Sequence, residues 1–192
     1  MIDGCSSNCR ADSSEISWSR TVAYLGVTFK SSSNLQVDVK NRRSKFYQAF
    51  NSIFRKASKS GDIVLLSLLN SLCPPCLNYG LEPFDMNVIT GKKLNVPLQP
   101  AFNKIFGVYD NITVNHCMYY CGLLPAPLEI TFRKYKLLCK ARNSLNLNMR
   151  LCSSLNEIAV DEILSRYGSG GPMSFNELRK QLFSSFFNSF AD

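Results

Sequence analysis

Four cysteines have spacings that would suit a metal or redox site. Cys73 and Cys76 enclose two prolines in a C-x-x-C pattern, and Cys117 and Cys121 lie four residues apart. Four thiolates of this kind can hold Zn²⁺ tetrahedrally. Both pairs lie in apolar segments, and a buried helix rather than a βαβ unit precedes the first pair, which argues against a thioredoxin-like motif. We expect structural thiols and no cofactor, with a Cys-rich zinc or redox protein as an alternative.

Other catalytic groups are sparse. His116 is the single histidine, and its neighbour Cys117 would point away from it on a helix. The carboxylates are scattered, no two aspartates are adjacent, and no glycine-rich phosphate loop is present. Two-metal phosphoryl chemistry needs clustered carboxylates. We therefore expect no complete active site, and enzymatic activity stays uncertain.

Positive charge is concentrated in two parts of the chain. Lys and Arg number 22 against 14 acidic residues, which gives a formal charge of +8 and a pI near 9.1. Residues 39–61 hold seven basic residues and no acid, and residues 130–156 hold six and no acid. Such clustering favours a nucleic-acid partner over an anionic membrane. The alternative is a basic soluble protein without a polyanionic partner.

Amphipathic helices are expected to present these charges. Over residues 35–58, Phe46, Phe50, Ile53 and Ala57 form an apolar stripe at helical spacing. The opposite side carries Lys45, Arg55, Lys56 and Lys59. Over residues 128–145, Leu128, Phe132, Tyr135 and Cys139 face inward, and Arg133, Lys136 and Lys140 face outward. The sequence thus predicts two outward-facing basic clusters.

The remaining segments predict a mainly α protein with a small β element. Residues 16–29 favour one or two strands with Gly26 inside the second, and residues 63–84 a buried helix kinked or broken at Pro74 and Pro75. Pro97 and Pro100 leave two short helices or one distorted helix open for residues 86–108. A short helix within residues 109–127, one over 154–167 and a terminal helix after a Gly-Ser linker complete the pattern. Without an apolar signal segment or membrane span, an intracellular location, nuclear or cytoplasmic, is expected.

A series of segments resembles a known family. "YLGVTF", "LLNSLCPPCLNYGLEPF", "PAFNKIFGV" and "MYYCGLLPAPLEI" occur in that order within about residues 15–147. They resemble the C-terminal part of reverse transcriptases of non-LTR (LINE-type) retrotransposons, which are RNA-directed DNA polymerases. The resemblance implies a primer-grip β-hairpin at Tyr24–Val27 followed by a helical thumb-like bundle. The family's aromatic-x-Asp-Asp motif has no counterpart here, so the resemblance implies no polymerase centre, and magnesium would belong to a palm domain.

The resemblance also implies a division of the chain and a partner. We expect a flexible arm over 1–14, a primer-grip-like element over 15–34, a thumb-like domain over 35–167, and a linker and terminal helix over 168–192. The partner would be an RNA–DNA or DNA duplex, together with a fingers and palm domain. The residues expected to contact nucleic acid are Tyr24, Leu25, Gly26, Val27, Lys45, Arg55, Lys56, Lys59, Arg133, Lys136 and Lys140. The alternative is a retrotransposon remnant without independent activity, which would expose an apolar patch.

Overall fold

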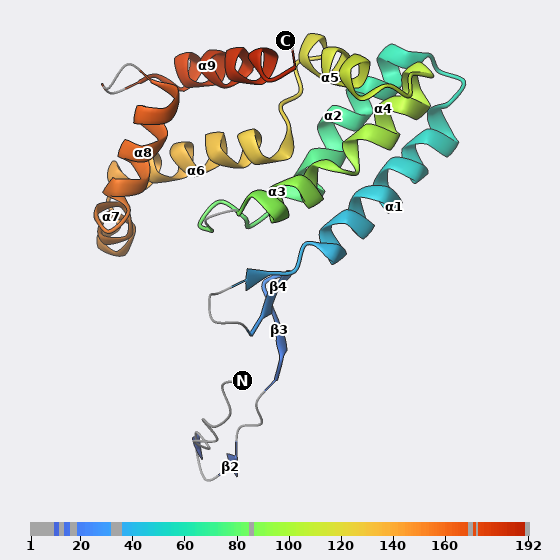
Figure 1. Cartoon of the computed structure of the whole chain (residues 1–192). Coiled ribbons are helices and arrows are strands. Elements are labelled where there is room, and N and C mark those ends of the chain that lie inside the picture. The colour runs from blue at the N-terminus through green and yellow to red at the C-terminus, as the bar shows by residue number, and fades with distance from the viewer. Residues whose placement is uncertain are drawn as a thin grey trace. The chain divides into compact units, whose positions relative to one another are not determined.

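A computed structural model describes residues 10–11, 14–15, 19–31, 36–84, 87–168, 171 and 173–190 (Figure 1). The chain divides into two compact units, Met1–Asp38 and Val39–Asp192. The first unit holds short antiparallel strands and the second holds helices. This arrangement confirms the expected mainly α fold with a small N-terminal β-hairpin.

The N-terminal unit contains two small antiparallel sheets. In one, β1 (Arg10–Ala11) pairs with β2 (Ser14–Glu15). In the other, β3 (Thr21–Tyr24), β4 (Val27–Lys30) and β5 (Gln36–Val37) lie in that order, with β4 in the centre. The expected hairpin is formed by β3 and β4.

A two-residue turn joins β3 to β4. Tyr24 pairs with Val27, so Leu25 and Gly26 form the loop, and their φ angles are 46° and 76°. Two-residue hairpin turns of type I′ need positive φ at both central positions, which glycine adopts without steric cost. The expectation that Gly26 lies inside a strand was therefore wrong, because this glycine serves the turn.

One face of the three-stranded sheet is apolar. Val22 pairs with Phe29, Tyr24 with Val27, and Phe29 with Val37, so these side chains share a face. Val27 is buried, whereas Val22 and Tyr24 are 55% and 65% exposed. The edge strand β3 therefore presents apolar side chains to solvent.

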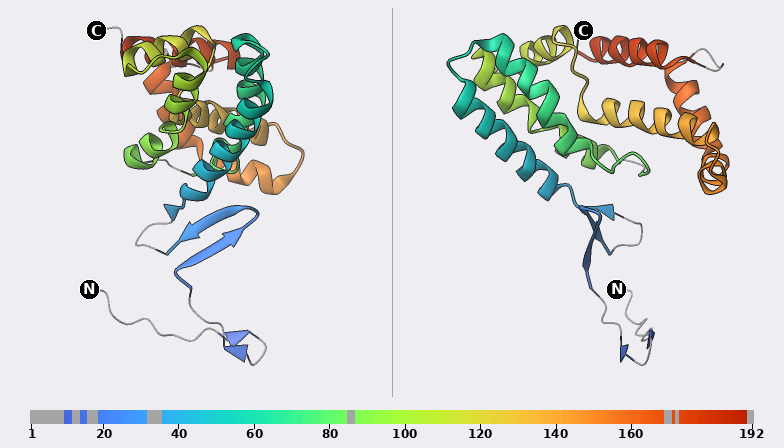
Figure 2. Two further views of the ribbon diagram at one scale, coloured as in Figure 1. Left: turned by 90° about the vertical axis from the view of Figure 1, so that its right-hand side faces the viewer. Right: turned by 180° about the vertical axis from the view of Figure 1, so that it is seen from behind.

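The helical unit begins with α1 (Lys40–Ala57) and α2 (Asp62–Asn78), which pack against each other over most of their lengths (Figure 2). The expected start of the first helix at residue 35 was wrong. Residues 36–37 instead pair with β4, and the backbone N–H of Asp38 donates to the carbonyl of Thr28 across 2.7 Å. Those strand contacts compete with the helix and delay its start.

Helix α2 continues through Pro74 and Pro75 and ends at Asn78, short of the expected residue 84. The sequence allowed a kink or a break at the prolines, and the continuous helix rules out the break. The two prolines remove the N–H groups that would bond the carbonyls of Asn70 and Ser71. Both of those residues are exposed, so water can satisfy their carbonyl groups.

For residues 86–108 the sequence allowed either two short helices or one distorted helix. The structure has two helices there, α3 (Val88–Asn95) and α4 (Leu98–Phe106). Pro97 is the N-cap of α4 and Pro100 lies in its first turn. N–H groups there have no intrahelical acceptor, so proline costs little. The expected short helix follows as α5 (Asn111–Tyr120).

The remaining helices are α6 (Ala126–Arg142), α7 (Leu147–Ser154), α8 (Glu157–Tyr167) and α9 (Phe175–Asn188). The expected helix over 154–167 begins later, at Glu157, and α7 ends where it was expected to start. The expected terminal helix, α9, is present and packs against α5, α6 and α8 within the same unit. A capping box of Ser174 and Glu177 begins it.

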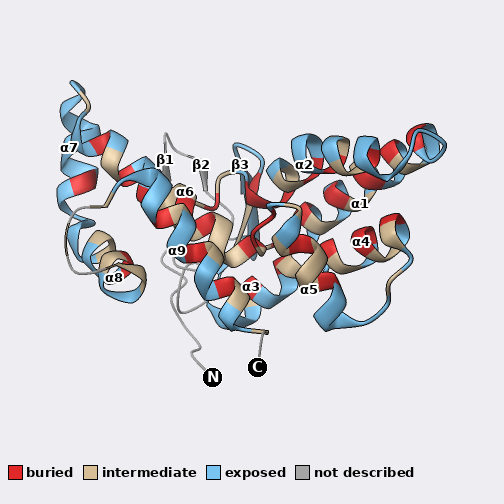
Figure 3. Ribbon diagram, turned by 90° about the horizontal axis from the view of Figure 1, so that it is seen from above, coloured by how far each residue is buried: buried red, intermediate tan, exposed pale blue. Residues whose placement is uncertain are grey.

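The core of the helical unit lies along the inward sides of these helices, where Figure 3 shows the buried residues in red. Phe46, Leu69, Phe102, Leu178 and Leu182 are each 0% exposed. Helices α3 and α6 approach closely, since a Cβ placed on Gly91 would lie 3.0 Å from Cγ of Pro127. Gly91 thus permits a contact that a side chain would obstruct.

Candidate nucleic-acid interface

The side of α1 that faces away from the core is exposed and lacks acidic residues. Its cations are Lys45, Arg55 and Lys56, and Lys59 follows in the next turn. Exposed neutral polar residues fill the same stripe: Asn41, Gln48 and Ser52. We call Lys45, Arg55, Lys56 and Lys59 the basic side of α1. The predicted outward position of all four is observed.

The basic side of α1 has no internal charge compensation. None of its four cations forms an ion pair with any residue that the structure describes. Phosphate groups bind exposed lysine and arginine mainly through charge. This side of α1 is therefore the candidate surface for a polyanion.

Lys104 of α4 adds a cation that the sequence did not reveal. Its Nζ donates to Oδ1 of Asn51 in α1 across 3.3 Å and lies 5.8 Å from the Phe54 ring centroid. The side chain is exposed. Because α4 is distant in sequence, only the packing of the helices places this charge beside α1.

Arg42 belongs to the same basic segment but points inward. It is 4% exposed, and its guanidinium carbon lies 5.1 Å from the Tyr79 ring centroid. Burial lowers the pKa of Arg42 below its ordinary value, and nearby Tyr79 and Glu82 act in the opposite direction. Its Nη2 has no hydrogen-bond partner among the described residues. Arg42 therefore serves packing rather than ligand contact.

The second basic cluster, on α6, is partly neutralised. Nε of Arg133 lies 3.0 Å from Oε1 of Glu129, and its Nη1 lies 3.9 Å from Oε1 of Glu82. Lys136 and Lys140 are exposed, and Nζ of Lys136 lies 5.9 Å from the Phe175 ring centroid. Of the three residues predicted here, only the two lysines keep their charge fully available.

The two clusters lie on helices that share α2 as a packing neighbour. Helix α1 packs extensively on α2, and α6 contacts the same helix less extensively. The basic side of α1 keeps all four of its charges unpaired within the described residues, whereas Arg133 of the α6 cluster is paired. The basic side of α1, together with Lys104, is the stronger candidate.

The predicted primer-grip residues lie at the β3–β4 turn of the other unit. Tyr24 and Leu25 are 65% and 72% exposed, and Gly26 is exposed. Val27 is only 7% exposed, so its side chain is not presented to a ligand. The accessible part of this element is therefore residues 24–26.

The cysteines form no metal-ligand group within the described ranges. No cluster of three or more His, Cys, Asp and Glu side chains occurs among those residues. Burial, with a smaller contribution from Cys76, raises the pKa of the Cys73 thiol to about 12. Burial, with Cys117 nearby, also raises the pKa of Cys121. The Cys73 thiol therefore has the character of a core side chain, whereas Cys121 is half-buried.

His116 packs into an aromatic cluster between α5 and the C-terminal end of α9. Its ring centroid lies 4.8 Å from that of Phe190 and 6.4 Å from that of Tyr120. Tyr119 lies 4.9 Å from Phe187 in the same cluster. These ring contacts give His116 a packing role.

Within the described residues, no helix combines the length and apolarity that crossing a membrane requires. Comparison with known proteins found no matching family model, curated protein or solved structure.

Proposed function

We propose that this protein is a thumb-like module, derived from a non-LTR reverse transcriptase, that binds duplex nucleic acid through the phosphate backbone. It would hold template–primer without a polymerase centre of its own. One observation carries the binding proposal. The exposed side of α1 bears four cations and no acid, and none of the four is paired within the described structure.

The geometry of α1 suits a backbone partner. Lys45 and Lys56 lie eleven residues apart, which is about 16 Å along a helix. Phosphates follow one strand of a duplex at about 3.4 Å along its axis, so several phosphates lie within that span. Contacts of this kind fix position and orientation without reading base sequence. We therefore expect binding that depends on salt and little on sequence.

The ordered series of sequence segments supports the assignment to a reverse-transcriptase thumb. It runs from Tyr24 through the Cys73-Pro-Pro-Cys76 segment to the Gly122–Pro125 turn. The β3–β4 hairpin precedes α1, in the order that the resemblance implies for grip and thumb. Because the chain has no adjacent aspartates, polymerase activity would require another chain or domain.

A salt-titrated binding assay tests the proposal. Fluorescence anisotropy with a labelled DNA duplex and an RNA–DNA hybrid would compare wild type with a variant carrying glutamine at Lys45, Arg55, Lys56 and Lys59. Replacing four cations lowers the formal charge from +8 to +4 (8 − 4). On DNA, the slope of log K against log salt should weaken by about 0.9 for each lost phosphate contact.

A second variant, with the same net charge as the first but with the basic side of α1 intact, serves as the control. Glutamine at Lys92, Lys93, Arg166 and Lys180, all exposed and outside both basic windows of the sequence, also gives +4. It should retain most of the affinity. Equal losses in the two variants would show that only net charge matters, and absence of binding by wild type at low salt would refute the proposal.

A second candidate is a retrotransposon remnant that does not function without a palm domain. The observation favouring it is the exposed apolar surface of the hairpin, where Val22, Tyr24 and Leu25 are 55%, 65% and 72% exposed. Exposed apolar patches mark missing partners or aggregation-prone surfaces. Strong ANS fluorescence without a cooperative melt would favour the remnant, whereas weak fluorescence with a cooperative melt would favour a working module.

A further inference from the structure

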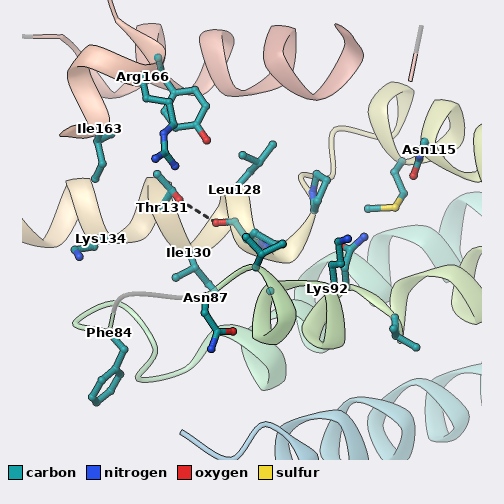
Figure 4. Close-up of a pocket in the computed structure, with 18 of the residues that line it drawn as sticks. Phe84, Asn87, Lys92, Asn115, Leu128, Ile130, Thr131, Lys134, Ile163 and Arg166 are labelled. Carbon is teal, nitrogen blue, oxygen red and sulfur yellow. Dashed lines mark hydrogen bonds between the residues drawn. The ribbon is translucent and has the colours of Figure 1, made fainter. Parts of the chain in front are cut away.

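A cavity of about 760 Å³ opens between α3, α5, α6 and α8 (Figure 4). Pockets for small molecules commonly enclose about 300–1,000 Å³. No residue of α1 lines this cavity. It is therefore separate from the basic side of α1, and its chemistry does not depend on the proposed function.

The cavity has an apolar wall contributed by several helices. Met118, Ile130 and Ile163 line it and are 1%, 3% and 8% exposed. Val88 and Leu128 also line it. Such a wall can pack against the organic part of a ligand, while the polar groups around it fix the ligand's orientation.

Cations from three helices border the same space. Lys92 of α3, Lys134 of α6 and Arg166 of α8 line it, and Glu162 is the one carboxylate among the lining residues that the structure describes. Figure 4 shows Lys92 rising from α3 and the Arg166 guanidinium directed toward Thr131 from α8. Neither Lys92 nor Arg166 pairs with an acid in the described part of the chain.

Asparagine side chains give the cavity further hydrogen-bond donors. Oδ1 of Asn87 accepts from the backbone N–H of Thr90 across 2.7 Å, and Oδ1 of Asn95 accepts from that of Ala126 across 3.1 Å. Each amide oxygen is thereby engaged in capping a helix, and the Nδ2 groups remain as donors. A pocket rich in cations and N–H donors is complementary to a ligand rich in acceptor oxygens.

We propose that this cavity binds a small phosphate ester of about mononucleotide size. Arg166 contacts the phosphate, Lys92 contacts acceptor atoms elsewhere on the ligand, and the apolar wall at Met118, Ile130 and Ile163 contacts the organic group. The arginine can offer paired donors to phosphate oxygens, and the lysine adds a point charge. The ligand class follows from this combination of an anion-binding rim with an apolar wall.

Isothermal titration calorimetry with AMP, with inorganic phosphate as a second arm, tests the proposal. AMP should bind with one-to-one stoichiometry, more tightly than inorganic phosphate. Lys92→Met and Arg166→Met should each weaken AMP binding by about tenfold or more. Lys180→Met removes the same charge at an exposed position outside the cavity and outside the basic side of α1, and it should change the affinity by less than about twofold.

Three results would overturn the proposal: no AMP binding at about 10 mM, equal affinity for inorganic phosphate, or equal losses in all three variants. A measurement on the unmodified protein guards against misfolded variants. AMP should protect Lys92 from acetylation while its exposed neighbour Lys93, which does not line the cavity, stays reactive. Equal protection of Lys92 and Lys93, or protection of neither, would also refute it.

Discussion

Nζ of Lys104 in α4 donates a hydrogen bond to Oδ1 of Asn51 in α1 across 3.3 Å. The bond joins two helices that are far apart in sequence and places a fifth cation next to the basic side of α1. Nζ of Lys104 also lies 5.9 Å from the Phe50 ring centroid. The aromatic rings and the amide thus hold this charge where a bound phosphate backbone would meet it.

Lys104→Met should weaken duplex binding and reduce its salt dependence. Removing one phosphate contact lowers the slope of log K against log salt on DNA by about 0.9. Lys93→Met, an equal charge change on exposed α3 surface, is the matched control and should leave the slope unchanged. Anisotropy titrations at several salt concentrations measure both. Identical slopes for wild type and Lys104→Met would remove Lys104 from the interface.

Cys73 should be nearly inert toward alkylation. The thiolate is the reactive form, and with a pKa of about 12 only roughly one Cys73 side chain in ten thousand is ionised at about pH 8. Exposed Cys152 is the internal comparison. Timed treatment with iodoacetamide followed by mass spectrometry should show Cys152 modified long before Cys73. Comparable rates, or a Cys73–Cys76 disulfide in freshly purified protein, would revive the redox alternative.

Leu182→Ala should destabilise the whole helical unit. Leu182 in α9 is 0% exposed, and truncating a buried leucine costs about 2–5 kcal/mol. Gln181→Ala, at the exposed neighbouring position, should change the free energy of unfolding by less than about 0.5 kcal/mol. Urea unfolding followed by circular dichroism measures both. A separate early transition confined to the C-terminal helix would show that α9 folds independently of the other helices.

Asp110 should contribute to stability at neutral pH and lose that contribution in acid. Its Oδ2 accepts from the backbone N–H and the hydroxyl of Thr113, at 2.9 and 3.0 Å. These hydrogen bonds lower the pKa of Asp110 from its ordinary value of 3.8. Because the native pKa is the lower one, the stabilisation is present above the ordinary pKa and is lost as pH falls through the native value.

Asp110→Asn provides the measurement of that effect. Asparagine keeps an oxygen acceptor for the N-cap but does not titrate. When the pH is lowered from about 6 to about 3, the melting temperature of the wild type should fall by more than that of Asp110→Asn. The difference in melting temperature between the wild type and Asp110→Asn should therefore become smaller, or change sign, at acidic pH. Parallel melting curves across that range would show that Asp110 has no linked ionisation.

The helical spacing of apolar residues predicted the helices that carry the basic clusters, because each apolar stripe is a pattern within one continuous segment of the chain. Phe46 and Phe50 are buried as expected, and Lys45 and Lys56 are exposed. The start of α1 was missed because the pairing of Val37 with Phe29 joins parts of the chain separated by a turn. Long-range pairing of this kind overrides local helix propensity.

Tertiary packing also determined which charges are available. Arg42 is buried against Tyr79, Arg133 approaches Glu82 from the segment after α2, and Lys104 is brought beside α1 by α4. No spacing rule within one helix separates an arginine that faces a ring from one that faces water. The sequence therefore predicted that basic residues face outward on α1 and α6. Which of the basic residues are available to a ligand could be identified only from the packing of the helices.

The close approach of Gly91 to Pro127 makes position 91 a means of adjusting the spacing of α3 and α6. An alanine there would bring a methyl group within 3.0 Å of the proline ring and press the two helices apart. Since both helices border the cavity, a single added carbon would alter its width while leaving Lys92, Arg166 and the asparagines chemically intact. Ligand preference could in this way be tuned by backbone separation alone.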